Sequence, residues 1–114
     1  MAETRSEVLQ GTLDLMVLKT LEAMGPQHGY GIARRIEQVS EDVLQLNQGT
    51  IYASLVRLLH KRWITAAWGT SENNRRARFY SITRAGRKQL ARETESWERI
   101  AGVMGRVLRL VDRS

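Results

Sequence analysis

One segment, LNQGTIYASLVRLLHKRWI at residues 46–64, combines hydrogen-bonding and positively charged side chains at helical spacing. Ile51, Leu55, Leu58 and Leu59 fall on one side of such a helix, which predicts a buried apolar face. Hydroxyl groups beside cations suit a polyanionic ligand, although an ordinary solvated face has the same composition. The polar row follows the spacing i, i+4, i+7, i+11: Thr50, Ser54, Arg57 and Lys61.

The charge distribution of the whole chain supports an anionic partner. The net charge is +6, but residues 1–56 contain four basic and seven acidic side chains. Residues 57–92 contain ten basic side chains and one acidic one, Glu72. A basic block interleaved with aromatic residues is typical of nucleic-acid binding, and a merely solubilising surface is the alternative. The aromatic residues of this block are Trp63, Trp68, Phe79 and Tyr80.

Other classes of chemistry lack the residues that they need. The 114 residues suit one domain, and no apolar run approaches the roughly eighteen residues of a membrane span. There is no cysteine, and His28 and His60 have no partners at ligand spacing, so we expect neither a metal nor a cofactor. No nucleophile stands with a base, and the acidic residues are scattered. We therefore expect a cytoplasmic protein that is not an enzyme and has no membrane partner.

Periodicity predicts two helices before the opening segment. Thr12 is a candidate N-cap for a first helix that stops at Gly25-Pro26. Leu15 and Leu18 lie off its main apolar face, which indicates contacts on two sides. A second helix starts near residues 29–31, and a third starts near Asn47 or Gln48.

After the third helix the periodicity changes to two. Alternating residues on either side of the polar run SENNRR predict a β-hairpin, with Arg75 and Arg76 at its tip and Arg78 on the returning strand. Thr83 is a candidate N-cap for a last helix that continues to about Val111. Such a helix is about 40 Å long, so part of it must leave a domain of this size.

The last helix carries apolar residues at heptad spacing. An exposed seam of this kind is an aggregation hazard in a monomer, so we expect it to pack against a second copy, with packing on its own domain as the alternative. The seam positions follow 4-3-4-3-4-3 spacing: Leu90, Thr94, Trp97, Ala101, Met104, Leu108 and Val111.

The predicted fold class is mainly α with a small β-hairpin, in the order of a winged helix-turn-helix followed by a long C-terminal helix. Four segments, GTLDLMVLKTL, HGYGIARRI, GTIYASLVRL and RRARFYSITRAGRKQL, resemble in this order the PadR family of winged-helix transcription regulators. The resemblance implies a DNA-binding part at residues 1–83 and a dimerisation helix at residues 84–114, forming one structural unit. The short C-terminal part is similar to the compact branch of that family.

The resemblance also implies a function. It predicts a homodimeric repressor that binds a palindromic operator in double-stranded DNA, controls its own and neighbouring genes, and is relieved by a small hydrophobic effector. A winged helix that contacts other proteins without specific DNA binding is the competing interpretation. We expect Trp97, Ala101 and Met104 to line an effector pocket between subunits, unless Trp97 is simply dimer core.

Residue roles follow from the helix phase and the resemblance together. The first turns of a recognition helix lie deepest in the major groove, so we expect base contacts from one set of residues and phosphate contacts from another. Tyr52 has a packing role as an equal alternative. The expected base readers are Gln48, Thr50, Ser54 and Arg57, and the expected phosphate contacts are Tyr30, Tyr52, Lys61, Arg75, Arg76 and Arg78.

Two positions depart from the family pattern. Ala53 stands where many relatives have proline, and it favours helix. Arg62 stands where relatives usually have glycine, the residue that best tolerates the left-handed conformation at a helix end. We expect either a strained helix end or a phosphate contact at Arg62.

Overall fold

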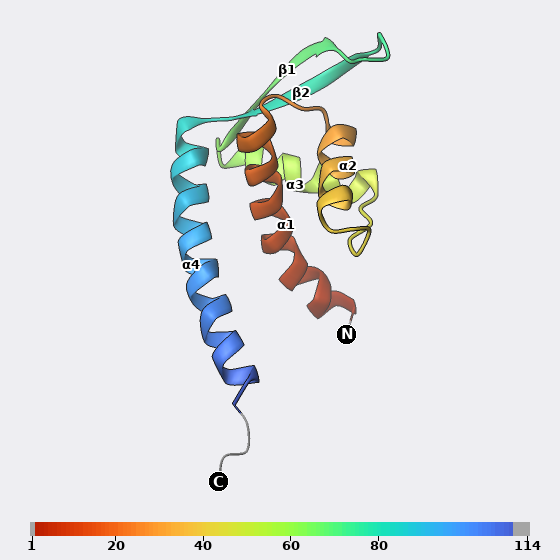
Figure 1. Ribbon diagram of the computed structural model, residues 1–114. Coiled ribbons are helices and arrows are strands. Elements are labelled where there is room, and N and C mark those ends of the chain that lie inside the picture. Colours follow the sequence, from red (N-terminus) through yellow and green to blue (C-terminus); the bar gives the residue numbers. More distant parts are fainter. Residues whose placement is uncertain (1, 111–114) are drawn as a thin grey trace.

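Four helices and a two-stranded antiparallel hairpin make up the fold (Figure 1). The computed structural model describes residues 2–110, with only the backbone described for residues 2–10. The elements are α1 (Ala2–Met24), α2 (Gly29–Val39), α3 (Gln48–His60), β1 (Ile64–Thr70), β2 (Arg76–Ile82) and α4 (Arg84–Leu108). The predicted fold class and element order are confirmed.

Side-chain caps mark the starts of α2, α3 and α4; Thr83 was predicted as one, and Asn47 was one of two candidates. Asn47 accepts a hydrogen bond from the Thr50 amide at the start of α3, and Thr83 accepts one from the Gly86 amide at the start of α4. The third cap is His28, whose Nδ1 accepts from the Gly31 amide at 3.0 Å. His28, which has no partner at metal-ligand spacing, is therefore a helix cap.

The predicted start of the first helix is wrong. Thr12 lies inside α1, which begins ten residues earlier, at Ala2. Residues 2–10 contain no glycine or proline, so their helix propensity extends the helix although they lack the apolar periodicity on which the prediction relied.

The core forms where α1 crosses the other elements. Val17, Leu18 and Leu21 of α1 are buried against a continuous apolar cluster to which every other element contributes. This burial on two sides agrees with the predicted two-sided α1. The other members of the cluster are Leu13, Ile32, Ala33, Ile36, Ile51, Leu55, Leu58, Ile64, Tyr80 and Leu90.

The hairpin is tied to the helices at its base. The backbone of Gln27, just after α1, exchanges two hydrogen bonds with Tyr80 of β2, at 3.1 and 2.8 Å. Arg62 has φ of 62°, the left-handed conformation of the strained helix end that was one of the two alternatives for this position, and its carbonyl oxygen accepts from the Thr83 hydroxyl at 2.9 Å. Gly86 lies so close to the Trp63 carbonyl that a Cβ there would overlap it.

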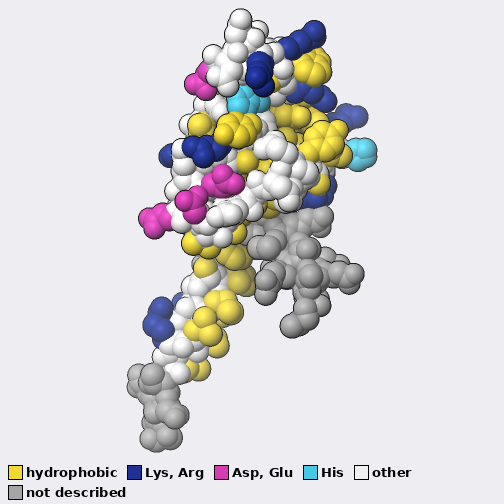
Figure 2. All heavy atoms as spheres, turned by 90° about the vertical axis from the view of Figure 1, so that its right-hand side faces the viewer, with side chains coloured by type: hydrophobic (Ala, Val, Ile, Leu, Met, Phe, Trp, Pro, Cys, Tyr) yellow, Lys and Arg dark blue, Asp and Glu magenta, His cyan; other side chains and the backbone are white. Residues whose placement is uncertain are grey.

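Helix α4 runs beside α1 and then projects beyond the rest of the fold (Figure 1). The longest dimension of the whole molecule is 63 Å. Of the seam residues, Leu90 is buried in the core and Thr94 is half-buried. Trp97, Ala101, Met104 and Leu108 are exposed, and Figure 2 shows hydrophobic side chains along this projecting part. Val111 lies outside the described residues.

Candidate nucleic-acid interface

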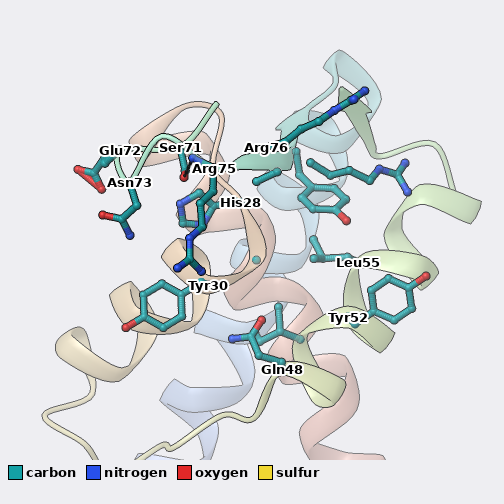
Figure 3. Close-up of a pocket in the computed structure, with 15 residues that line it drawn as sticks. His28, Tyr30, Gln48, Tyr52, Leu55, Ser71, Glu72, Asn73, Arg75 and Arg76 are labelled. Carbon is teal, nitrogen blue, oxygen red and sulfur yellow. Dashed lines mark hydrogen bonds between the residues drawn. The ribbon is translucent and has the colours of Figure 1, made fainter. Parts of the chain in front are cut away.

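A hollow of about 600 Å³ lies between α2, α3 and the hairpin (Figure 3). Tyr30 lines it from the first turn of α2, and Gln48 and Tyr52 line it from α3. From the turn between the strands, the Arg75 side chain points into the hollow on the side of Tyr30 (Figure 3). Arg76 and Arg78 complete the basic wall. The helix that was predicted to read bases and the hairpin that was predicted to contact phosphates therefore share one surface.

The charges of the hairpin are not neutralised within the described residues. The ion pairs there are Lys19–Glu22 and Arg57–Asp14, and neither involves the hairpin. The Cζ of Arg76 lies instead 4.9 Å from the ring centroid of Trp68. The Cζ of Arg78 lies 5.8 Å from the ring centroid of Tyr80. Figure 2 shows Lys and Arg side chains gathered over this end of the molecule. The surface is therefore positive and exposed, as a polyanion requires.

The turn that carries these arginines is well formed. Ser71 and Arg75 are joined by a backbone hydrogen bond of 2.8 Å, and the Ser71 hydroxyl accepts from the Arg75 amide at 3.3 Å. Asn74 adopts φ of 59°, which asparagine tolerates better than most residues. These contacts fix the backbone of the turn from which Arg75 and Arg76 project.

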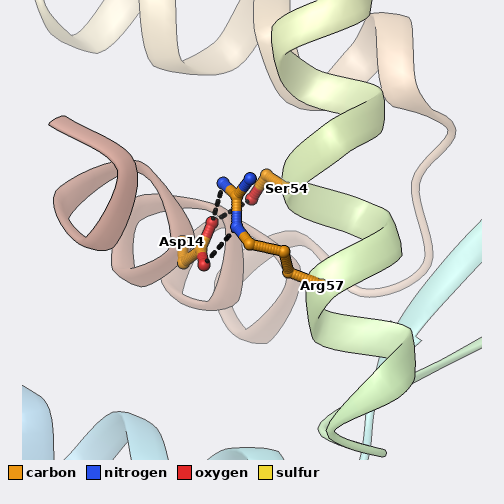
Figure 4. A network of polar contacts seen from close by, with 3 residues as sticks. All are labelled: Asp14, Ser54 and Arg57. Carbon is orange, nitrogen blue, oxygen red and sulfur yellow. Dashed lines mark hydrogen bonds and ion pairs between the residues drawn. The ribbon is translucent and has the colours of Figure 1, made fainter. Parts of the chain in front are cut away.

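On the opposite side of α3 lies a polar network that joins it to α1 (Figure 4). The Ser54 hydroxyl donates to Oδ1 of Asp14 at 2.6 Å. Arg57 donates to both Asp14 oxygens, through Nε at 3.0 Å and Nη2 at 2.7 Å. The hydrogen bond with Asp14 raises the pKa of Arg57 above its usual value, against the smaller opposing effect of burial.

This network involves two of the predicted base readers, and it is incompatible with the prediction for Ser54. Ser54 is fully buried, so its hydroxyl is not presented on the exposed face of α3. Arg57 is partly exposed, but its guanidinium is held by Asp14. The prediction took the whole polar row as solvent-facing, whereas its two middle members, Ser54 and Arg57, contact α1 and its two ends, Thr50 and Lys61, are exposed. The sequence signal that was missed is Asp14, an acidic residue within the apolar part of the first helix.

The remaining predicted DNA contacts are accessible. Gln48 and Thr50 are exposed in the first turn of α3, and Tyr30 and Tyr52 are each 60% exposed. Tyr52 is thus not a core residue of the described structure. Lys61 is exposed at the C-cap of α3, with Nζ 4.8 Å from the Trp63 ring centroid, and does not line the hollow.

The predicted effector residues are only partly brought together. Trp97 lines a shallow hollow of about 390 Å³ between α1 and α4, together with Leu15, Glu93 and Ile100. Ala101 and Met104 lie further along α4 and do not line it. Within residues 2–110, no helix is long and apolar enough to cross a membrane, and no group of three metal-binding side chains occurs.

Solved structures of similar proteins have the same fold. A transcriptional regulator from Clostridium thermocellum aligns with a TM-score of 0.77 at 27% identity, over 88% of this chain and 93% of that one. A PadR family regulator from Clostridium difficile aligns with a TM-score of 0.71 at 30% identity, over 83% and 96%. A PadR-like regulator from Bacillus cereus has a TM-score of 0.78 over 92% and 99%, and at 21% identity it supports the fold alone.

Sequence comparison agrees with these alignments. Uncharacterized protein X of Lysinibacillus sphaericus is 26% identical over 100 residues, which are 88% of this chain and 91% of that protein. A 37.1 kDa protein in transposon TN4556 of Streptomyces fradiae is 40% identical over 88 residues, 77% of this chain, but the chain spans only 24% of its length. The model of the transcriptional regulator PadR-like family matches residues 17–92, which include the C-terminal part of α1, all of α2 and α3, the whole hairpin and the start of α4. The chain therefore belongs to the PadR-like family of transcriptional regulators.

Proposed function

We propose that this regulator is a homodimeric repressor that binds a palindromic operator in double-stranded DNA upstream of its own gene. One observation carries the proposal: the unpaired hairpin arginines Arg75, Arg76 and Arg78 stand beside the exposed N-terminal half of α3. In a winged helix the recognition helix enters the major groove, and the wing lies along neighbouring phosphates. A module that only contacts proteins has no need for this concentration of unneutralised charge.

Each part of the surface has a distinct role in this proposal. Gln48 and Thr50 contact base edges, because they are exposed at the N-terminus of α3. The exposed hydroxyls and cations around them contact phosphates, which orient the protein without reading sequence. These phosphate contacts are Tyr30, Tyr52, Lys61, Arg75, Arg76 and Arg78.

The dimer forms along the apolar face of α4. Trp97, Ile100, Met104 and Val107 are each about half exposed, and they lie on one side of the helix beyond the core. Burial of this face against a second copy removes its contact with water and produces the two-fold symmetry that a palindromic operator requires. The hollow beside Trp97 then takes a flat hydrophobic effector, which releases the DNA by changing the angle between the two DNA-reading heads.

The test is nuclease footprinting of the duplex upstream of the gene, followed by affinity measurements between about 50 and 200 mM salt. We expect a two-fold symmetric footprint and a steep fall of affinity with salt, because the arginines displace condensed counterions. Arg76→Ala should weaken binding to every duplex alike and flatten the salt slope by roughly one unit. The matched control is Arg99→Ala, since Arg99 is exposed on α4 away from the hairpin. An affinity that does not change with salt contradicts the proposal.

Effector release has its own measurement. Flat hydrophobic compounds should quench the fluorescence of Trp97 and weaken operator binding together, with Trp97→Phe separating its signal from those of Trp63 and Trp68. If the Trp97 signal and operator affinity are unchanged by every compound, Trp97 belongs to the dimer core alone.

A further inference from the structure

The exposed ridge of α3 has an unusual composition for a helix that reads DNA. We define the ridge as Gly49, Ala53, Val56 and His60, which recur every three or four residues and are all exposed. They lie opposite the buried face of α3, formed by Ile51, Ser54, Leu55 and Leu58. Apart from His60 in the last turn, the ridge has no side chain that donates or accepts a hydrogen bond.

The ridge stands between two hollows. The basic hollow lies on the side of Gln48 and Tyr52. A second hollow of about 550 Å³ lies on the other side, where the ridge residues Gly49 and Ala53 form part of its wall. The rest of its lining comes from Thr50 and Arg57 of α3, from Leu13 and Met16 of α1, and from residues 44–47 before α3. A ridge with hollows on both sides has the shape that enters a groove, so its side chains approach the floor of the groove most closely.

The Asp14 network determines which chemistry is available on this surface. Arginine and lysine are the usual readers of guanine, through paired hydrogen bonds to O6 and N7. Arg57, the one arginine within α3, donates instead to both oxygens of Asp14. A helix whose central ridge positions are alanine and valine is therefore matched to apolar groups on the floor of the groove.

The major groove offers one such group, the C5-methyl of thymine. Resting on the proposed DNA-binding function, we propose that Val56 and Ala53 read thymine methyl groups in each operator half-site. Val56 is 41% exposed, which leaves its methyl groups free to contact a ligand while its backbone remains in the helix. Lys61 at the C-terminal end of α3 and the arginines of the hairpin place positive charge near the ridge. This charge favours DNA over an apolar protein surface as the molecule that the ridge contacts.

The experiment uses the full chain and begins by selecting preferred duplexes from a random pool. Each thymine of the selected duplex is then replaced singly by uracil, which removes the methyl group and keeps the base-pairing edge unchanged. At one position at least in each half-site, the replacement should weaken binding about fourfold, the effect of exposing one methyl-sized group. At the thymine that Val56 contacts, the same replacement should not change the affinity of the Val56→Ala variant, because the affinity of this variant for the thymine duplex is already reduced.

The matched control is Val39→Ala, because Val39 is a 67% exposed valine on α2, outside both hollows beside α3. This variant should keep the full sensitivity to uracil. If no uracil replacement weakens the native chain, or if Val56→Ala keeps the full sensitivity, the thymine reading is overturned. Salt-dependent binding to the selected duplex would in that case leave the proposed function standing, whereas failure to select any duplex would overturn both.

Discussion

The carboxylate of Asp14 in α1 accepts two hydrogen bonds from the guanidinium of Arg57 in α3, and a third from the Ser54 hydroxyl. These contacts join residues 40 and 43 positions apart, and they fix the rotation of α3 about its own axis. Since Asp14 and Arg57 are only 13% and 27% exposed in their side chains, solvent weakens this pair little. Asp14 is therefore a positioning residue, because it decides which side of α3 faces outward.

Asp14→Asn should lower the free energy of unfolding by about 2 kcal/mol, because it removes the charge from a cluster of hydrogen bonds to an ionised partner. The measurement is urea unfolding at fixed protein concentration. Glu22→Gln is the control, since Glu22 pairs with Lys19, whose side chain is 66% exposed. Glu22→Gln should lower the free energy of unfolding by less than about 0.5 kcal/mol. Equal effects of the two variants would mean that the Asp14 network does not stabilise the fold.

Gly86→Ala should destabilise the protein by about 2 kcal/mol or more, because the new Cβ overlaps the Trp63 carbonyl oxygen and the backbone must shift. Gly102 is the matched control in the same helix, where the nearest heavy atom to an added Cβ is the Arg106 guanidinium at 3.7 Å. Gly102→Ala should raise stability by up to about 1 kcal/mol through helix propensity. Thermal unfolding of the two variants should move in opposite directions. A Gly86→Ala protein as stable as the native chain would refute the close approach.

Arg62→Gly should stabilise the protein by about 1 kcal/mol, because arginine at φ of 62° has a steric cost that glycine avoids. Asn74→Gly, at φ of 59°, should change stability less, since asparagine already tolerates this conformation. The midpoint of denaturant unfolding measures the stability change of each variant. A destabilised Arg62→Gly variant would show that the arginine side chain makes a stabilising contact that exceeds its backbone strain.

Met104→Glu should convert the proposed dimer to a folded monomer, because it places a charge on the apolar face of α4 without touching the core. Sedimentation at micromolar concentration gives the mass, and circular dichroism checks the fold. Arg99→Glu is the control, on the opposite side of α4. If both variants sediment like the native chain, the second copy packs elsewhere.

Much of the fold was predictable because its signals are local. Thr83 was predicted as a cap from its place just before a periodic segment, and Asn47 was one of two candidates for the start of the third helix; both make cap hydrogen bonds. At position 62 the resemblance to the PadR family suggested a left-handed helix end, and Arg62 has that conformation. Such features depend on a few neighbouring residues, so one sequence contains them.

The rotation of α3 was not predictable in the same way. Leu59 was assigned to the buried face and is half-buried, whereas Ser54 was assigned to the DNA face and is fully buried. Burial of a hydroxyl is stable only with a hydrogen-bond partner, and that partner is 40 residues away, on α1. No pattern within α3 contains this information.

The contact between Gly86 and the Trp63 carbonyl sets the direction in which α4 leaves the domain. Residues 86–108 extend about 33 Å at 1.5 Å per residue, so a tilt of about 10° at Gly86 displaces Leu108 by about 6 Å. That displacement is nearly two base-pair steps of about 3.4 Å. In the proposed dimer joined along α4, substitutions around Gly86 are therefore expected to change the number of base pairs between half-sites while leaving the bases recognised in each half-site unchanged.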